Sequence, residues 1–342
     1  MRKFFAFLLL ILLCTVLPGH ARDISPLILT VTSYPLSEEE KLYIQQVNPY
    51  GFVFVEKDFR KGIDLFALKS ELNGILDHKI YFFVDQEGGT VNRLKYLFPE
   101  KKFPSAEFYG NIAEEQGLKK ARDLVFEKAK EMATLLSLIS VDVNFSPNAE
   151  IRPYSYNGFF RSRLYSEFTH VVTVLSHAFA EGTKAGGVEP CYKHFPGTAM
   201  SQVDPHKGIP VIKSLNLQDL ERRELIPFAP AKNYKYIMMG HALYPQIDPQ
   251  NITTFSPIFY QLLREKLQFE GLIITDALNM KATGAISIGD KIANSLSAGA
   301  DLAMPFFDDD MPFDKRLQEL NKIPPGIIKK FNKKINKTTS ES

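Results

Sequence analysis

The sequence contains few of the residues from which disulfide scaffolds and metal sites are built. The 342-residue chain has two cysteines, Cys14 and Cys191, and no tryptophan. Cys14 lies in an N-terminal apolar run, and removal of that run would exclude an internal disulfide. The absence of HExxH, of CxxC and of GxGxxG after the first predicted strand argues against the common zinc and dinucleotide signatures. A formal net charge of +2 gives no strong attraction for nucleic acid.

Residues 1–21 have the pattern of a secretory signal peptide. A short basic start is followed by an apolar run over 4–17 and by small residues up to Ala21. We expect cleavage before Arg22 and export of the protein to the periplasm or the exterior. The run is short for a transmembrane helix. Lipid attachment at Cys14 and retention as an uncleaved signal anchor are the alternatives that would leave the protein on a membrane.

The remaining chain alternates short apolar runs with longer amphipathic ones. Strands are predicted over 27–31, 51–55, 79–84, 141–145, 187–191, 234–239, 272–274 and 301–304. Helices are predicted from Ser37 and over 63–76, 114–138, 164–185, 217–224, 257–267 and 289–298. Short apolar strands separated by helices indicate a parallel sheet. Eight such units favour a single α/β domain over residues 22–324, folded as a (β/α)8 TIM barrel.

Residues 325–342 form a basic C-terminal tail with five lysines between 329 and 337. We expect a capping helix with a solvated lysine face. Weak association with a membrane or cell wall, through this tail or the N-terminus, is a further alternative.

Ionisable residues follow several predicted strands at the point where each strand ends. They are Asp85, Lys193, His194, His241 and Asp276. In a barrel these ends open on one face, where active sites are built. Asp85, both histidines and Asp276 could form a mixed metal site, but no ligand spacing supports one. We therefore expect no metal or other cofactor, and carboxylate chemistry on a neutral, hydroxyl-rich substrate.

The polar loop after the fifth predicted strand contains a second acid–base pair. Asp204 and His206 are two residues apart in a segment marked by Gly and Pro. A carboxylate beside an imidazole can fix its tautomer and raise its basicity. The same pattern is also typical of a solvated loop without a catalytic role, so the loop sequence alone leaves both interpretations open.

Three segments resemble glycoside hydrolase family 3, in the branch of bacterial β-N-acetylglucosaminidases. They are VDQEGGTVNRL over 84–94, KHFPG over 193–197 followed by DPHKGIP over 204–210, and GLIITDALNMKA over 271–282. Their order and spacing agree with the family, and the similarity extends from about residue 26 to 306. Two departures lie in the loop: Thr198-Ala199 stands where the family has His-Gly, and Pro205 where it has Ser.

The resemblance implies a role for each matching residue. Asp276 matches the catalytic nucleophile, His206 the acid/base histidine and Asp204 its partner. The sugar-binding positions are matched by Asp85, Arg93, Arg161, Lys193 and His194. We assign His241 to the border of the pocket, and Glu87 to a structural role at the Gly88-Gly89 turn.

The implied activity is that of an exported, retaining β-N-acetylglucosaminidase acting on peptidoglycan fragments or related aminosugar glycosides. Three alternatives remain beside it. The first is a family 3 β-glucosidase, which is disfavoured because the chain is too short for the later domain that supplies the carboxylate acid in those enzymes. A phosphorylase is the second alternative, since an imidazole donor repels phosphate less than a carboxylate does. The third is a sugar-binding protein that has lost turnover.

Overall fold

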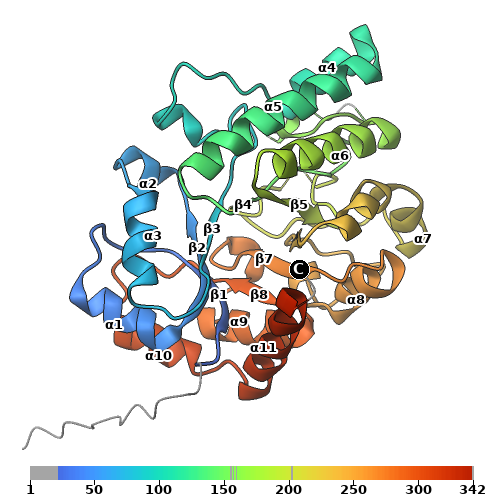
Figure 1. Cartoon of the computed structure of the whole chain (residues 1–342). Helices are drawn as coiled ribbons and strands as arrows, with labels where there is room; N and C mark the ends of the chain where they lie inside the picture. The colour runs from blue at the N-terminus through green and yellow to red at the C-terminus, as the bar shows by residue number, and fades with distance from the viewer. Residues whose placement is uncertain (1–21, 155, 157, 159, 202, 341–342) are drawn as a thin grey trace, which may run out of the picture.

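The computed structural model of the chain (Figure 1) describes residues 22–154, 156, 158, 160–201 and 203–340. The predicted signal peptide and Cys14 lie outside the described residues. In the described part of the chain, no helix is both long enough and apolar enough to cross a membrane.

Eight strands form a closed barrel in sequence order, and every neighbouring pair is parallel. The predicted (β/α)8 architecture is therefore confirmed. The strands are β1 (Ser25–Leu29), β2 (Pro49–Phe54), β3 (Tyr81–Val84), β4 (Val143–Asn144), β5 (Glu189–Phe195), β6 (Tyr236–Met239), β7 (Leu272–Ala277) and β8 (Leu302–Met304).

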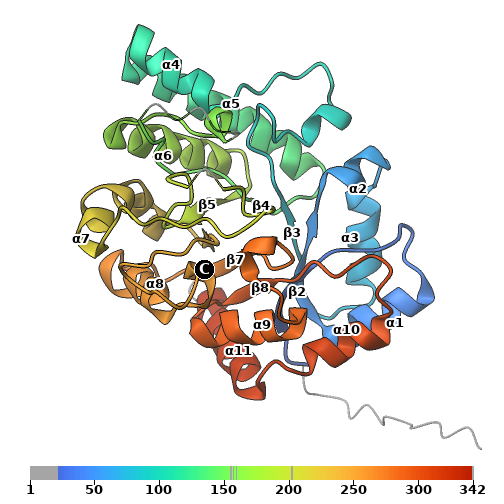
Figure 2. The same cartoon turned by 180° about the vertical axis from the view of Figure 1, so that it is seen from behind.

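Helices surround the barrel. Figures 1 and 2 show α4, α5 and α6 stacked along one side and α9, α10 and α11 on the opposite side. The helices are α1 (Glu38–Val47), α2 (Glu56–Arg60), α3 (Leu65–Asn73), α4 (Ala106–Gln116), α5 (Leu118–Leu138), α6 (Thr169–Ala185), α7 (Leu217–Asp219), α8 (Pro257–Gln261), α9 (Ile288–Ala298), α10 (Phe313–Leu320) and α11 (Pro325–Ser340). Helices α7 and α8 continue as π-helical turns over Leu220–Glu224 and Leu262–Lys266.

Local signals explain where the predicted boundaries were right and wrong. Ser37 caps α1 as expected, because its side chain accepts from the Glu40 amide. The helix predicted over 114–138 ends at Leu138 as expected, but its predicted start is wrong: Gly117 has a φ of 94°, which ends α4 before α5 begins at Leu118. The helix predicted over 164–185 begins only at Thr169. The strand predicted over 187–191 instead extends to Phe195, so Lys193 and His194 belong to β5.

The barrel interior is filled by side chains from all strands, including the free thiol residue Cys191, which is buried as expected. At the amino ends of the strands the Tyr50 and Tyr236 hydroxyls lie 2.7 Å apart. Phe331 of α11 packs against Tyr50 there, with ring centroids 5.6 Å apart. This end of the barrel is thus closed, and the opposite end carries the cavity.

Helix α11 is the predicted basic tail, and it packs against the barrel through buried Phe331 and Ile335. The sequence predicted a solvated lysine face, and this is only partly correct. Lys334 Nζ donates to Asp301 Oδ1 at 2.8 Å and to the Gly271 carbonyl at 3.0 Å. Lys330 and Lys333 are exposed.

Candidate active site

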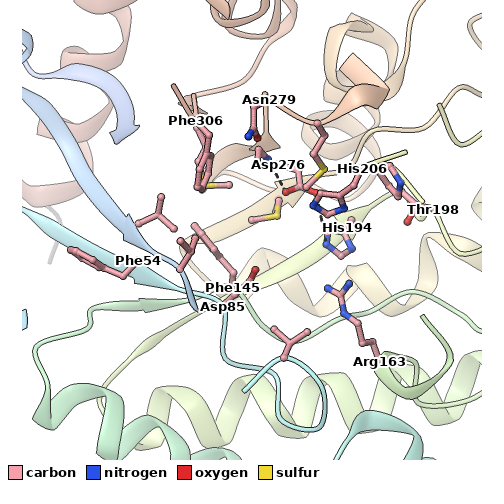
Figure 3. A pocket seen from close by; sticks show the side chains of 18 of the residues that line it. Phe54, Asp85, Phe145, Arg163, His194, Thr198, His206, Asp276, Asn279 and Phe306 are labelled. Carbon is pink, nitrogen blue, oxygen red and sulfur yellow. Dashed lines mark hydrogen bonds and ion pairs between the residues drawn. The ribbon is translucent and has the colours of Figure 1, made fainter. Parts of the chain in front are cut away.

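A cavity of about 380 Å³ opens at the carboxyl ends of the strands (Figure 3). Every strand from β2 to β8 contributes a residue to it, at or just after the end of the strand: Val53, Asp85, Phe145, His194, Met238, Asp276 and Met304. The remaining wall includes Phe54 and Phe306 on apolar faces, and Arg93, Arg163 and His206 on polar ones. The expected gathering of strand-end residues on one face is confirmed for Asp85, His194 and Asp276.

Asp276 is the penultimate residue of β7, and its side chain is bonded to the backbone of the next residue. Its Oδ1 accepts from the Ala277 amide at 2.7 Å. Its Oδ2 lies 3.9 Å from His194 Nε2. One carboxylate oxygen is therefore fixed, while the other faces the cavity beside an imidazole.

His194 lies between two carboxylates. Its Nδ1 is 2.6 Å from Glu150 Oε1, while Nε2 faces Asp276. Glu150 is 4% exposed and also accepts from the loop at Thr198 and Ala199. Burial alone would raise the pKa of Glu150, but the contacts with His194 and Thr198 lower it to about 2.

Asp85 belongs to a cluster of charged side chains whose other members are Lys193, Glu87 and Arg163. Lys193 Nζ contacts Asp85 Oδ1 and lies 2.6 Å from Glu87 Oε1. Arg163 donates to both oxygens of Glu87, at 2.6 and 2.9 Å. Burial would raise the pKa of Glu87, but Arg163 and Lys193 hold it well below its usual range.

This cluster corrects two expectations from the sequence. Glu87 is structural as expected, but it bonds to Arg163 and Lys193 rather than to the amides of its turn. Lys193 is 1% exposed and does not line the cavity. Lys193 therefore acts on the cavity indirectly, because its ammonium group contacts the carboxylate of Asp85, which does line the cavity.

Arg161 is not at the cavity, which corrects its predicted role. Its guanidinium donates to Glu107 Oε1 at 2.5 Å and to the Tyr156 carbonyl at 2.7 Å. Arg163 lines the cavity instead. The prediction matches Arg161 to the arginine of a fourth family segment, Asp-Arg-Ser-Phe, in which an aromatic residue lies two positions after the arginine. Arg163 is followed at that spacing by Tyr165. That spacing is the signal by which Arg163 could have been found.

Arg93 lines the cavity as predicted. Its Nη1 donates to Glu56 Oε2 at 3.0 Å. Its Nε is buried and has no hydrogen-bond partner among the described residues. A buried donor without a partner is costly unless a ligand or water accepts from it, so the Arg93 side chain is suited to receive a polar group.

His241 does not line the cavity, contrary to expectation. It is 1% exposed, with Nδ1 against the Thr254 hydroxyl and Nε2 3.1 Å from the Ala277 carbonyl. Burial lowers its pKa. His241 therefore supports the end of β7 from behind, next to Asp276.

The loop after β5 brings His206 to the cavity. His206 Nδ1 is 3.0 Å from Asp204 Oδ1, and the His206 amide donates to the same oxygen at 2.9 Å. The Pro205 carbonyl accepts from the Ala282 amide at 3.0 Å, which ties the loop to the segment after β7. The pair predicted from the sequence is thus formed, and His206 and Asp276 line one cavity (Figure 3).

Glu150 was missed by the sequence reasoning. It follows β4 by six residues, between buried Ala149 and Ile151, and belongs to none of the three matching segments. The surrounding sequence, SPNAEIRP over 146–153, mixes polar and apolar residues and gives no signal that sets Glu150 apart.

The four residues considered for a mixed metal site do not form one. Among the described residues, no group of three or more His, Cys, Asp or Glu side chains is placed to hold a metal ion. His241 is turned away from the cavity, and His194 Nδ1 is occupied by Glu150.

The fold and the cavity define a barrel enzyme with carboxylate and imidazole groups at the carboxyl ends of its strands. The family model described as "Glycosyl hydrolase family 3 N terminal domain" matches residues 57–329. The chain therefore belongs to glycoside hydrolase family 3.

Relatives support this assignment. A beta-hexosaminidase of Neisseria gonorrhoeae is 28% identical over 283 residues, which cover 82% of this chain and 77% of the relative. A beta-hexosaminidase of Thiobacillus denitrificans is 29% identical over 285 residues, covering 82% and 78%. The protein is accordingly a glycoside hydrolase, as the resemblance implied.

Solved structures show the same fold. NagZ of Neisseria gonorrhoeae, in complex with N-trifluoroacetyl-D-glucosamine, has a TM-score of 0.79 at 24% identity, covering 92% of this chain and 90% of that one. LpqI of M tuberculosis has a TM-score of 0.74 at 22% identity, covering 90% and 89%.

Proposed function

We propose that the protein is a retaining β-N-acetylglucosaminidase that releases terminal N-acetyl-β-D-glucosamine, with peptidoglycan fragments as its natural substrates. The observation that carries this proposal is that Asp276 and His206 reach one cavity from different elements. A retaining glycosidase needs a nucleophile at one face of the anomeric carbon and a proton donor near the glycosidic oxygen. The names of the relatives support the choice of an aminosugar.

In the first step, an oxygen of Asp276 attacks the anomeric carbon while His206 donates a proton to the departing glycosidic oxygen. The carbon–oxygen bond to the aglycone breaks, and a glycosyl ester forms on Asp276. In the second step, neutral His206 takes a proton from water, and the water oxygen attacks the anomeric carbon. The ester bond breaks, and both groups return to their starting states.

Asp204 would orient His206 through Nδ1 and stabilise the imidazolium that donates the proton. Burial would raise the pKa of Asp204, but the amide and ring of His206 lower it, so the carboxylate stays charged beside the ring. The side chain of His206 is 66% exposed. It can therefore exchange protons with solvent between the two steps.

The polar wall suits the hydroxyl groups of a hexose. Asp85 is fixed by Lys193, Arg163 by Glu87, and Arg93 offers its buried Nε. Charged groups held in place form strong hydrogen bonds to hydroxyls without reorganising. Phe54 and Phe306 supply apolar faces on the other part of the wall.

Hydrolysis of 4-nitrophenyl N-acetyl-β-D-glucosaminide tests this function. The wild type should release nitrophenol, at a rate far above that with the β-D-glucoside, and Asp276→Asn should not. Absence of turnover by the wild type, together with retained sugar binding, would contradict it. Formation of a sugar 1-phosphate in phosphate buffer would instead identify a phosphorylase.

We also propose that the protein is exported, with residues 1–21 removed. The composition of that segment supports this, and Ile24, close to the expected cleavage site, donates from its amide to Asn332 Oδ1 of α11 at 2.9 Å. N-terminal sequencing of the mature protein should start at Arg22. A chain starting at Met1, or carrying lipid on Cys14, would contradict cleavage.

Weak membrane or cell-wall association through α11 is part of the same proposal. Exposed Lys329, Lys330 and Lys333 lie on a helix that contains no acidic residue. Such binding should be released by salt. Its persistence after Lys330→Glu and Lys333→Glu would exclude α11 as the contact.

A further inference from the structure

We infer that Glu150 is a positioning residue that sets, through one buried carboxylate, both the tautomer of His194 and the start of the loop that carries His206. This inference rests on the proposed function of the cavity. Glu150 touches neither the cavity nor His206, so its effect on a reaction would pass through the groups that it holds.

The two oxygens of Glu150 have different partners. Oε1 lies 2.6 Å from His194 Nδ1. Oε2 accepts from the Ala199 amide at 2.8 Å, from the Thr198 hydroxyl at 2.9 Å and from the Thr198 amide. All of these donors are buried or nearly so. A carboxylate with this many donors is acceptor-only, so His194 must present a proton on Nδ1.

The consequence for His194 concerns its other nitrogen. With Nδ1–H bonded to Glu150, Nε2 is turned toward Asp276 Oδ2, 3.9 Å away. A doubly protonated ring satisfies both carboxylates, and a neutral ring keeps its proton on Nδ1. An amide at position 150 would keep an oxygen for Thr198 and Ala199, but would turn an N–H₂ group toward Nδ1. The favoured neutral tautomer would then carry its proton on Nε2.

The charged and titratable groups around this carboxylate come from several elements. Besides His194 of β5, Arg163, Glu224, Tyr156 and Tyr244 interact electrostatically with Glu150. His194 itself faces Glu150 and Asp276, with His241 behind the end of β7. None of the other groups is hydrogen-bonded to Glu150 among the described residues, so His194 is the group that its charge orients.

The consequence for the loop follows from where its bonds lie. Glu150 fixes Thr198 and Ala199, the first residues after the Gly197 turn. Further along, Pro205 bonds to Ala282, and the Pro210 carbonyl accepts from the Leu243 amide at 2.8 Å. Among the described residues, bonds at Thr198 and Ala199, at Pro205 and at Pro210 hold the segment that carries Asp204 and His206. The bonds at Thr198 and Ala199 go to Glu150, which also holds His194 beside Asp276.

Glu150→Gln, with Thr198→Val as the matched control, tests this inference. Long-range ¹H–¹⁵N spectra of histidine-labelled protein report which ring nitrogen of His194 carries the proton, and a His194→Gln variant assigns the signal. We expect Nδ1–H in the wild type and in Thr198→Val, and Nε2–H in Glu150→Gln. We expect kcat/KM on an alkyl aminosugar glycoside to fall roughly 100-fold in Glu150→Gln, and by less than about 10-fold in Thr198→Val.

Three results would overturn the inference. They are an Nδ1 without a proton in the wild type, an unchanged tautomer in Glu150→Gln, or equal kinetic losses in the two variants. The wild-type spectrum can overturn the inference even where Glu150→Gln does not fold. It also needs no substrate, so a wild type without hydrolysis would reject the proposed function and leave the tautomer test of Glu150 valid.

Discussion

The two sides of the cavity are built in opposite ways. Behind the side that Asp85 and Arg163 line, Lys193 and Glu87 have side chains that are 1% and 9% exposed and hold each other in place. On the other side, His206 is 66% exposed and is anchored mainly through Asp204 and the backbone of its loop. Groups that must keep one position are locked by buried charge. The group that must gain and lose a proton has access to water.

This difference separates folding stability from turnover. Breaking a buried ion pair leaves a desolvated charge and costs folding free energy, whereas truncating an exposed imidazole costs little. Substitutions on the buried side should therefore destabilise the protein, and those at the loop should slow the reaction without unfolding it. Asp276 lies at the end of β7, and its substitution by Asn should affect turnover alone.

The largest effect is expected for Asp276→Asn. An amide cannot act as the nucleophile, so kcat should fall by at least about 10⁴-fold. The isosteric side chain keeps the bond from the Ala277 amide, so the melting temperature should change little. Steady-state kinetics and thermal unfolding of the same preparation check both parts. A fall of less than 10-fold in kcat, about the loss expected of a bystander, would remove Asp276 from the mechanism.

The next effect is on stability, in Glu87→Gln. Arg163 and Lys193 would lose the charge that they share, and the free energy of unfolding should fall by about 3–5 kcal/mol. Urea unfolding measures this. The control is Asp123→Asn, which breaks an exposed pair with Lys119 and should leave stability essentially unchanged. Similar losses in the two variants would show that burial of the cluster is not what stabilises it.

His206→Ala should be smaller in effect and confined to the reaction. With an alkyl or sugar leaving group, kcat/KM, which reports the first step, should fall roughly 10²–10³-fold, because the departing oxygen needs a proton. With a nitrophenyl leaving group the loss in the first step should be much smaller. Comparison of the two substrates checks the assignment, and equal losses for both would argue against a role in proton donation.

The smallest expected effect is a pH dependence of stability. The pKa of Glu150 is lowered from 4.5 to about 2 in the folded protein. Its stabilisation is therefore fully present above the unfolded pKa and is lost as the pH falls toward 2. The difference in unfolding free energy between wild type and Glu150→Gln should shrink below about pH 4.5. A difference that grows on acidification would contradict the assigned cause.

Much of the architecture could be predicted because the barrel strands are short apolar runs that end in polar residues. Asp85, His194 and Asp276 follow directly from that pattern. Helix boundaries failed where one residue decided them, as Gly117 did between α4 and α5. Burial of Lys193 and His241 depends on tertiary packing, which a strand-end position does not reveal.

The candidate site was predictable where a motif fixed the register, as in the segments that contain Asp276 and the Asp204–His206 pair. Arg161 was chosen over Arg163 because the local segment allows two registers. The contacts that separate them are with Glu107 and Glu87, which lie more than fifty residues away. Glu150 belongs to no matching segment, and only the fold brings it to His194.

The central claim is that Asp276 forms a covalent bond to the sugar while His206 transfers the proton. A fluorinated N-acetylglucosaminyl donor that slows the second step should trap the intermediate, and mass spectrometry of the digested protein should locate it. We predict one N-acetylglucosaminyl group on the peptide that contains Asp276, and none in Asp276→Asn. A label on another residue, or turnover with inversion at the anomeric carbon and no trapped intermediate, would contradict the mechanism.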